Sequence, residues 1–388
     1  MAAQSGTRDR GEAARSVLVP LGALIGLVVI VVGTAFLADP KGGQNLLASI
    51  YDALGNAAGA RALRNGQGDQ FLSKLILAAV ALVVGVGGIW MVFSGASAIV
   101  GRLRPKLQAR IIPWVFVLPA VGLLGVYLVY ATGVTIWDSL VSGKGFGDNY
   151  GPLLGSDYLA IFRNNILWLV LATGGSVVLG LVIAGLFDRV RREALAKTFV
   201  FLPLAISLVG ASVIWRFVYT WRPASQPQYG LLNAVWTALG QQPVNWIAQP
   251  PIDTYALIVI MIWLQTGFAM VVLSAAIKGV STEVIEAARL DGATESQLFF
   301  RIIVPIIRGS IITVATTIAI AVLKVFDIVF VLTGGRYDTD VVANQMFLQK
   351  FVYFNDGRAA ALAAVLFIAV LPIMFINLRN LRKQGIGA

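Results

Sequence analysis

Long, continuous apolar segments are the feature of this sequence that most restricts its fold. Hydrophobic residues make up 58% of the 388 residues, and charged residues only 13%. Several apolar runs exceed the roughly 18 residues that a helix needs to cross the hydrocarbon core of a bilayer. A transmembrane barrel is built instead from short segments of alternating polarity. The sequence therefore predicts an all-α, polytopic integral membrane protein.

Eight apolar segments are long enough to be transmembrane helices. By residue number they are about 17–37, 72–100, 112–137, 165–187, 198–219, 254–277, 311–332 and 359–376. Basic residues gather after the second, fourth, sixth and eighth of these segments, as the positive-inside rule requires of cytoplasmic loops. This alternation predicts a multi-pass protein of the cell (plasma or inner) membrane with both termini in the cytoplasm.

The first two spans resemble an addition, because the six that follow from Ile112 form a complete topology by themselves. The expected parts are a cytoplasmic tail at 1–16, two additional N-terminal spans at 17–111 with an outer loop at 38–70, a six-helix transmembrane domain at 112–380, and a cytoplasmic tail at 381–388. Apolar residues recur at helical spacing between Leu46 and Leu54, which predicts a short helix in the outer loop. The role of that loop is left open.

Several kinds of chemistry are excluded by composition. The chain contains no cysteine and no histidine, which removes thiol chemistry, thiolate metal sites and histidine acid–base catalysis. It has no GxxxxGK[ST] sequence for holding nucleotide phosphates. The net charge of +11 lies mostly in short loops, so it reflects membrane topology and not nucleic-acid binding. We expect no catalytic residue, metal site or cofactor in this chain, and an enzyme acting on lipid-linked sugars is disfavoured.

Charged residues deep within the predicted spans are almost limited to Lys324 and Asp327. They are three residues apart, so on one helix they would share a face and could pair. One interpretation is an ion relay, which would make the protein an ion-coupled secondary transporter. The other is a pair that neutralises itself. The first predicts inverted repeats, and no repeat is visible in the sequence.

The loop at 278–308, between the sixth and seventh predicted spans, is amphipathic and rich in helix signals. Ser281 or Thr282 can cap a first helix. Gly292 ends that helix, and Thr294 with Gln297 three residues later forms the pattern of a capping box. The sequence predicts two short helices joined by a glycine turn on the cytoplasmic side of the membrane.

The same loop resembles the signature loop of permease subunits from binding-protein-dependent ABC importers. The matching residues are Glu286, Ala287, Ala288, Asp291, Gly292, Ala293 and Pro305. The resemblance covers about residues 112–380 and implies the type I ABC importer permease architecture. It also implies that this loop is the coupling helix, which docks on a separate ATPase subunit and transmits ATP-driven closure to the spans.

Other segments resemble sugar permeases in particular. They are the LP…W pattern between Phe199 and Tyr219, YGLLN from Tyr229, and TGG from Thr333. Eight spans, two of them additional and N-terminal, are similar to the larger permease of maltose-type importers. The sequence around residues 188–197 is similar to that of α-glucoside permeases. The resemblance implies import of a carbohydrate, such as an α-glucoside or another oligosaccharide, by alternating access.

The resemblance also implies a set of partners. They are a second permease subunit, two ATPase subunits that bind ATP and Mg, an extracytoplasmic sugar-binding protein and membrane lipid. The permease itself would be a transport subunit and not an enzyme. Which sugar is carried, and whether the partner permease is a distinct chain, are questions that the sequence leaves open.

Two departures from the maltose-type pattern limit the transfer of residue roles. The outer loop at 138–164 is too short for the large insertion of that subunit, and the sixth span has few polar residues. Candidates for the substrate path therefore come from chemistry: sugars stack on aromatic rings and bond through hydroxyls, and polar side chains in a membrane face the protein interior. The candidates are Ser207, Ser212, Trp263, Gln265 and Phe268. The alternative is that the serines and Gln265 only bridge helices.

Overall fold

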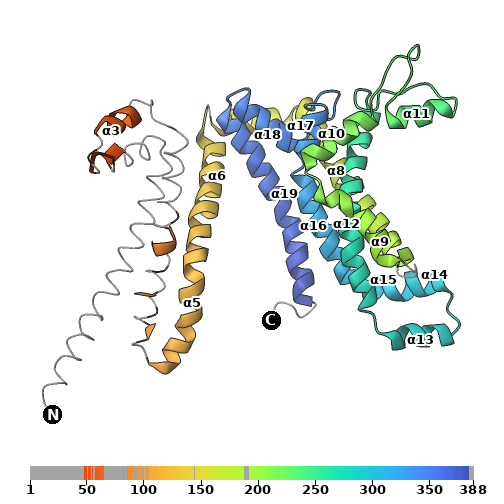
Figure 1. The fold of residues 1–388 in the computed structure, drawn as a ribbon, viewed down its shortest axis with the longest axis horizontal. Helices are drawn as coiled ribbons and strands as arrows, with labels where there is room; N and C mark the ends of the chain where they lie inside the picture. The colour runs from red at the N-terminus through yellow and green to blue at the C-terminus, as the bar shows by residue number, and fades with distance from the viewer. Residues whose placement is uncertain are drawn as a thin grey trace. The chain divides into compact units, whose positions relative to one another are not determined.

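A computed structural model describes most of the chain after residue 103 and parts of the chain before it. The described residues are 48–49, 51–53, 55, 57–64, scattered positions between 82 and 101, 104–143, 145–187 and 192–383. Within these ranges the regular elements are helices, in agreement with the predicted all-α class (Figure 1). The predicted span at 17–37 lies outside the described residues, and that at 72–100 is described only at scattered positions.

The chain divides into two compact units, Met1–Tyr130 and Ala131–Ala388. In the first unit, residues 48–49 and 51–53 are helical where the outer-loop helix is predicted. The other described helices of this unit are α3 (Ala57–Arg64), α5 (Pro105–Leu124) and η1 (Gly125–Tyr130). The candidate functional residues all lie in the second unit.

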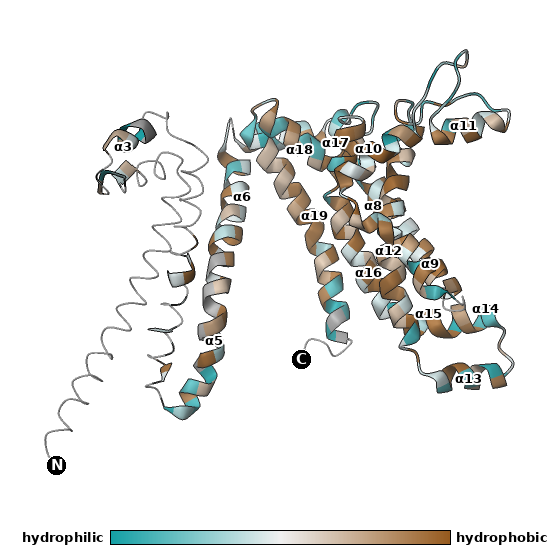
Figure 2. Ribbon diagram, in the orientation of Figure 1, coloured by the Kyte–Doolittle hydropathy of each residue, from teal (hydrophilic) through white to brown (hydrophobic). Residues whose placement is uncertain are grey.

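The second unit is a helical bundle with short helices at its two ends. Its elements are α6 (Ala131–Val141), α7 (Phe146–Tyr150), η2 (Gly151–Leu154), α8 (Ser156–Phe187), α9 (Glu193–Phe201), η3 (Leu202–Ala205), α10 (Leu208–Val218), α11 (Leu231–Ala238), α12 (Ile252–Lys278), α13 (Thr282–Leu290), α14 (Glu295–Gln297), η4 (Leu298–Ile303), α15 (Val304–Ile306), α16 (Arg308–Leu323), α17 (Asp327–Leu332), α18 (Val342–Phe351) and α19 (Asp356–Lys383). Figure 2 shows apolar residues along α8, α12, α16 and α19, and hydrophilic residues on α13 and α14. The pattern is that of helices whose long sides face lipid or one another.

Four helical segments in the described part are long and apolar enough to cross a membrane, or six if each of two bent pairs is one span. The four are Ala120–Val141, Ser156–Phe187, Ile252–Lys278 and Asp356–Asn380. They coincide with the predicted third, fourth, sixth and eighth spans. The six-span organisation from Ile112 onward thus agrees with the described helices when the bent pairs are counted, while the total of eight stays a prediction.

The predicted fifth span is not one straight helix. Its two halves, Glu193–Ala205 and Leu208–Val218, meet at an angle of 103°. Pro203 lies in η3 and lacks the N–H that a continuing helix would need. Ser207 then starts α10 as its N-cap, because its side chain accepts a hydrogen bond from the Gly210 N–H at 3.0 Å. The bend is therefore encoded by a proline and a new cap within one apolar run.

The predicted seventh span is also interrupted, and this corrects the expectation for its two charges. Helix α16 ends at Leu323, and α17 begins only at Asp327. Lys324 and Asp327 therefore do not share the face of one helix, and no ion pair joins them among the ion pairs of the described residues. At its other end, α16 meets the preceding helical stretch Glu295–Ile306 at an angle of 70°. The paired-charge relay has no geometric basis here.

The core of the second unit lies where α8 packs against α12. Trp168 on α8 and Leu257, Met270 and Leu273 on α12 are fully buried. The two helices approach closely at Gly180, where an added Cβ would lie 2.5 Å from the Ala269 Cβ and 2.8 Å from the Met270 backbone nitrogen. Because one of these neighbours is backbone, it cannot move aside as a flexible side chain would. Glycine is therefore required at this crossing.

Replacing Gly180 with leucine is expected to lower the free energy of unfolding by at least about 1–3 kcal/mol, the usual cost of overpacking a core. The measurement is the apparent melting temperature of the purified protein in detergent. Gly174→Leu on the same helix is the matched control, because nothing lies within 4 Å of a Cβ added there. Equal melting temperatures for the two variants would contradict the close approach of α8 and α12.

Candidate functional site

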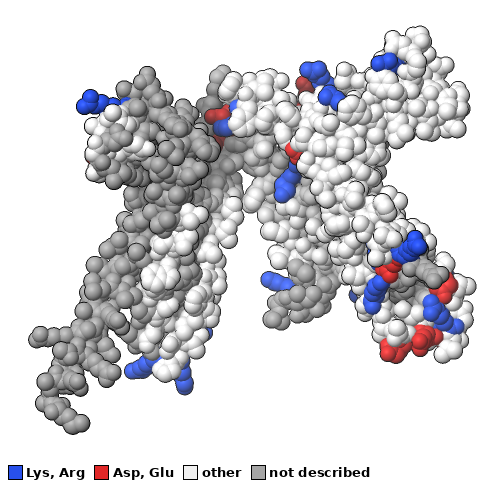
Figure 3. Space-filling model, viewed as in Figure 1, with Lys and Arg blue, Asp and Glu red and all other residues white. Residues whose placement is uncertain are grey.

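Helix α13 lies crosswise at one end of the second unit, beyond the end of α12 (Figure 1). Figure 1 places α10, α11 and α17 toward the opposite end. Charged side chains gather over α13 and α14 in the space-filling view (Figure 3). The predicted loop at 278–308 is thus a folded element that projects from the bundle, and its charge distinguishes it from the apolar sides.

The first helix of this element has the ends that its sequence predicts. Ser281 is the N-cap of α13, and its side chain accepts from the Val284 N–H at 3.4 Å. At the other end, the Gly292 N–H donates to the Arg289 carbonyl at 3.1 Å and the Ala293 N–H to the Ala288 carbonyl at 3.0 Å. This is the Schellman pattern, and Gly292 has the positive φ of 80° that it requires. The predicted glycine turn is confirmed.

The second helix begins with the predicted capping box. The Gln297 N–H donates to the Thr294 hydroxyl at 3.3 Å, and the Gln297 side chain accepts from the Thr294 N–H at 2.9 Å. Across the turn, Arg289 Nε lies 3.0 Å from Glu295 Oε1. Since both side chains are about half exposed, this ion pair contributes little to stability. Caps and turn together hold α13 and α14 at a fixed angle.

One face of α13 packs inward on the rest of the second unit. Ala288 is 8% exposed, and Ile285 is half-buried beside it. Below them η4 contributes Leu298, which is only 1% exposed, and the Phe299 ring. Phe299 lies so close to Gly185 of α8 that a Cβ added there would be 2.6 Å from the ring. Phe299 thus anchors the element on α8.

The opposite face of α13 is uncovered. Glu283, Glu286 and Ala287 are exposed, and Leu290 is 88% exposed. The outer face of α13 is therefore acidic and carries one fully exposed leucine. Phe300, next to Phe299, is 62% exposed and does not serve as an anchor.

The remaining residues of the predicted coupling loop lie outside α13, in the turn and in α15. Asp291 and Gly292 are exposed at the turn, whereas Ala293 is partly buried against the core. Pro305 is exposed in α15, just before the 70° bend that leads into α16. The structure thus places Pro305 apart from the turn, at the junction between the loop and the next span.

A cluster of charged residues that the sequence analysis missed joins α9 to α12. The Lys278 amine, at the end of α12, donates to the Glu193 carboxylate at 2.8 Å. Lys197 donates to the same carboxylate and to the hydroxyl of Ser274. The cluster ties the first turn of α9 to the last turns of α12, directly before α13 begins. Glu193, within the mostly basic segment 188–197, is the feature of the sequence that could have indicated it.

The predicted substrate-path serines are engaged with their own helix. Ser207 caps α10, and the buried Ser212 donates to the Leu208 carbonyl at 2.8 Å. These contacts agree with the structural interpretation of the two hydroxyls. The aromatic candidates differ: Trp263 on α12 meets Trp215 on α10 edge to face, with ring centroids 5.7 Å apart. Gln265 and Phe268 are half-buried on α12.

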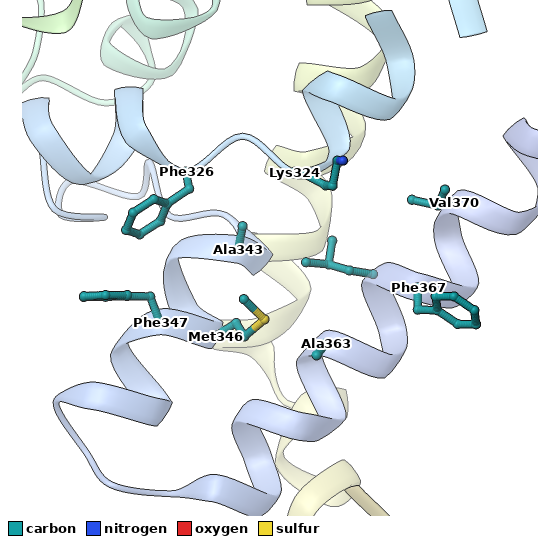
Figure 4. Close-up of a pocket in the computed structure, with 9 residues that line it drawn as sticks. Lys324, Phe326, Ala343, Met346, Phe347, Ala363, Phe367 and Val370 are labelled. Carbon is teal, nitrogen blue, oxygen red and sulfur yellow. The ribbon is translucent and has the colours of Figure 1, made fainter. Parts of the chain in front are cut away.

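A second aromatic cluster, which we call the phenylalanine ladder, consists of Phe326, Phe330, Phe347 and Phe351. Their ring centroids are 5.0–5.1 Å apart from neighbour to neighbour. Beside the ladder lies an apolar cavity of about 530 Å³ between the interruption after α16 and helices α18 and α19. Figure 4 shows Phe326 and Phe347 on one side of this cavity, Phe367 and Val370 on the other, and Lys324 at its edge. In the sequence, the ladder is indicated by two pairs of phenylalanines, each four residues apart.

Two adjacent asparagines on α8 hold the segment that leads from α17 to α18. Asn164 Nδ2 donates to the carbonyls of Asp338 and Asp340, at 2.6 and 3.0 Å. Asn165 Oδ1 accepts from the Val342 N–H at 2.8 Å, and its Nδ2 donates to the Leu323 carbonyl at 3.4 Å. Both side chains are buried. Asparagines within the fourth span therefore fix the interruption of the seventh.

The held segment contains a buried carboxylate at Asp340. Burial raises the pKa of this group to about 6, although hydrogen bonds from Asn344 and the Val341 N–H act in the opposite direction. Gly335 packs directly on it, since an added Cβ would lie 2.7 Å from Asp340 Oδ1. The last glycine of the TGG sequence, Gly335, is thus required by close packing against a carboxylate.

Comparison with known proteins gives consistent matches. A family model described as "Binding-protein-dependent transport system inner membrane component" matches residues 176–383. The osmoprotective compounds uptake permease protein GgtC of Synechocystis is 50% identical over 274 residues, covering 69% of this chain and 98% of the relative. The alpha-glucoside transport system permease protein AglF of Rhizobium meliloti is 46% identical over 302 residues, covering 76% and 89%.

Among solved structures, a chain of a bacterial alginate ABC transporter in complex with an alginate pentasaccharide-bound periplasmic protein has a similar fold. The TM-score is 0.63 at 21% sequence identity, and the match covers 73% of this chain and 98% of the other. At this identity the likeness shows the shared fold alone.

Proposed function

As a member of the family of binding-protein-dependent transport system inner membrane components, this chain is a permease of an ABC sugar importer, and we propose that it moves α-glucosides or similar oligosaccharides by alternating access. The substrate named for AglF, an α-glucoside, supports this choice of sugar. The permease performs no bond chemistry. It alternates between states open to the two sides of the membrane.

The proposed assembly contains four further protein components. They are a second permease subunit, two ATPase subunits that bind ATP and Mg, and an extracytoplasmic sugar-binding protein. The family description and the binding protein named in the alginate transporter complex support the last of these. The absence of a P-loop sequence supports separate ATPase subunits. Basic residues in alternate loops support a cell membrane location with both termini cytoplasmic.

The coupling role is assigned to α13, through Glu286, Ala287, Ala288, Asp291, Gly292, Ala293 and Pro305. The observation that carries this assignment is the two-faced helix itself: Ala288 is buried against η4, whereas Leu290 on the other face is 88% exposed. A partner that docks on the outer face of α13 would cover this leucine. The exposed acids around it would provide charged contacts at the rim.

The path of force follows from the same contacts. A push on the outer face of α13 passes through Leu298 and Phe299 to α8 at Gly185, and through the Glu193 cluster to α9 and α12. Packed side chains transmit such displacements because interiors compress little. Within the spans, Trp263, Gln265 and Phe268 on α12 remain the proposed substrate path, with Ser207 and Ser212 in a supporting role on α10. The ion-coupled alternative has no supporting contact, because Lys324 and Asp327 are on different helices.

Cysteine cross-linking tests the coupling role, and the natural chain has no cysteine to confuse it. Leu290→Cys and Ala287→Cys, on the exposed face, are expected to cross-link to an ATPase subunit in the assembled complex. Ala288→Cys, one residue away on the buried face, is the matched control and is expected not to react. Cross-linking from Ala288→Cys alone, or from none of the three in an ATPase-active complex, would remove α13 from the proposed interface.

A further inference from the structure

A polar cavity of about 450 Å³ lies at the end of the second unit away from α13. Its walls come from the start of α8, the start of α12 and the loop after α17. The side chains that matter below are Arg163, Asn164, Asp253, Thr254, Tyr255 and Asp338. The charge pattern of the sequence places this end outside the cell.

One wall of the cavity contains a carboxylate oxygen without a partner. Asp253 is 0% exposed. Its Oδ1 accepts from the Thr254 N–H at 2.7 Å, whereas no group in the described residues donates to its Oδ2. A buried acceptor left unpaired costs about 1–3 kcal/mol, and more when it is charged. Oδ2 of Asp253 is therefore an acceptor that the described residues leave unsatisfied.

The opposite wall presents a ready-made pair of donor and acceptor. Arg163 Nη2 lies 2.6 Å from Asp338 Oδ2, and the two side chains are 60% and 52% exposed. Asn164 holds the backbone of Asp338 through its hydrogen bond to the Asp338 carbonyl, so this acid is fixed in place. A guanidinium has five N–H donors in a planar fork, and those not used by Asp338 and the Asn164 side chain remain for a ligand. The exposed charges here are therefore positioned and not freely rotating.

Tyr255 and Thr254 complete the lining of the cavity, with an aromatic ring and a hydroxyl group. Tyr255 follows the buried Thr254 and is 47% exposed. The guanidinium of Arg163 and the carboxylate of Asp338 can form paired hydrogen bonds with neighbouring hydroxyls of a sugar. The exposed ring of Tyr255 can stack on the apolar face of a pyranose. The unpaired Oδ2 of Asp253 then accepts a further hydroxyl. Each polar feature of the cavity has a counterpart on a neutral, polyhydroxylated ring.

Other ligand classes fit less well. A phosphate or other anion would meet the unpaired carboxylate of Asp253. A divalent cation would have to compete with Arg163 for Asp338, and the described residues contain no group of three or more acidic side chains arranged to hold a metal. A neutral ligand rich in hydroxyls avoids both conflicts.

We infer that this cavity is a carbohydrate-binding subsite, separate from the proposed path at Trp263 and Gln265, where the permease itself contacts the sugar before translocation. The inference rests on the proposed function, because it assumes a sugar as the transported substrate. It adds a place of recognition at the end of the bundle where the binding protein would release its ligand.

The test uses the complete transporter in lipid nanodiscs without its binding protein, and radiolabelled maltose, trehalose and sucrose as probes in equilibrium dialysis. We expect weak, saturable binding of at least one sugar. Asp253→Ala and Tyr255→Ala are each expected to weaken it at least about tenfold, the loss of one well-placed contact. Tyr229→Ala, which removes an exposed tyrosine elsewhere, is the matched control and should leave binding unchanged. Because Tyr255 has an exposed ring, its variant remains informative even if Asp253→Ala fails to fold.

The outcomes separate the two proposals. ATP-driven uptake in proteoliposomes, with the binding protein added back, tests the transport function independently. Intact uptake by the wild type together with no direct sugar binding, or with binding equal in all variants, would overturn the subsite and leave the transport function standing. If Tyr255→Ala instead weakened docking of the binding protein with no change in sugar binding, the cavity would hold a side chain of that protein, and the subsite would likewise be overturned.

Discussion

Replacing Gly292 with proline is expected to abolish ATP-driven sugar uptake while leaving the protein folded in the membrane. Gly292 has φ of +80°, whereas proline is restricted to about −65°, so the turn between α13 and α14 cannot form. Proline also removes the N–H that donates to the Arg289 carbonyl. We expect a loss of at least about 100-fold, equivalent to about 2.7 kcal/mol of coupling. The measurements are uptake, sugar-stimulated ATP hydrolysis and recovery of ATPase subunits with the purified permease.

Gly240→Pro is the matched control for this variant. Gly240 has φ of +83° in an equally open environment, but it lies after α11, far from α13 in the fold. Both substitutions impose the same backbone conflict, so only the position differs. Uptake by Gly292→Pro comparable to that by Gly240→Pro would refute the coupling role of the turn.

Replacing Asn165 with leucine is expected to destabilise the second unit by about 2–4 kcal/mol. The change leaves the buried Val342 N–H without its acceptor at 2.8 Å and removes the donor to the Leu323 carbonyl. A buried backbone group that loses its partner costs about 1–3 kcal/mol. At about 2–4 °C for each kcal/mol in a domain of this size, the apparent melting temperature should fall by roughly 5–15 °C.

Asn165→Asp provides a graded control, because a carboxylate oxygen still accepts from Val342 while the donor to Leu323 is lost. Its melting temperature should lie between those of the wild type and the leucine variant. Equal stability of Asn165→Leu and the wild type would show that the interruption of the seventh span is held by other contacts, such as those of Asn164.

The two predictions concern different ends of one mechanism. In the proposed mechanism the turn at Gly292 would receive the push from the ATPase partner. The Asn164–Asn165 pair fixes the interrupted helix beside the phenylalanine ladder. Helix α8 connects the two, because it contacts Phe299 at Gly185 and carries both asparagines near its other end. A displacement of α8 at Gly185 would therefore also move Asn164 and Asn165.

Local chemistry explains why the coupling element could be predicted so closely. Ser281, Gly292 and the Thr294–Gln297 box act on backbone groups within four residues, so their effect is the same in any surrounding. The all-α class and the positions of the described spans are likewise set by composition, since a bilayer leaves a long apolar run few alternatives.

The substrate region could not be predicted in the same way. The serines chosen for sugar contact use their hydroxyls on their own helix, and the polar cavity near Asp253 was missed. Its parts are contributed by residues as far apart as Arg163 and Asp338, which only the packing of α8 against the loop after α17 brings together. No pattern within a window of sequence contains that information.

The sequence by itself determined that this protein crosses a membrane as helices and carries two capped helices joined by a glycine turn. Only the tertiary structure decided that the seventh span stops at Leu323 and that the proline and new cap of the fifth span produce a bend of 103°. The physical reason is that an apolar run fixes burial in lipid but not the continuity of its backbone hydrogen bonds. A break in the helix leaves backbone groups without hydrogen-bond partners. Where a side chain of another helix, such as Asn165, supplies those partners, the apolar run can be interrupted and still remain within the bilayer.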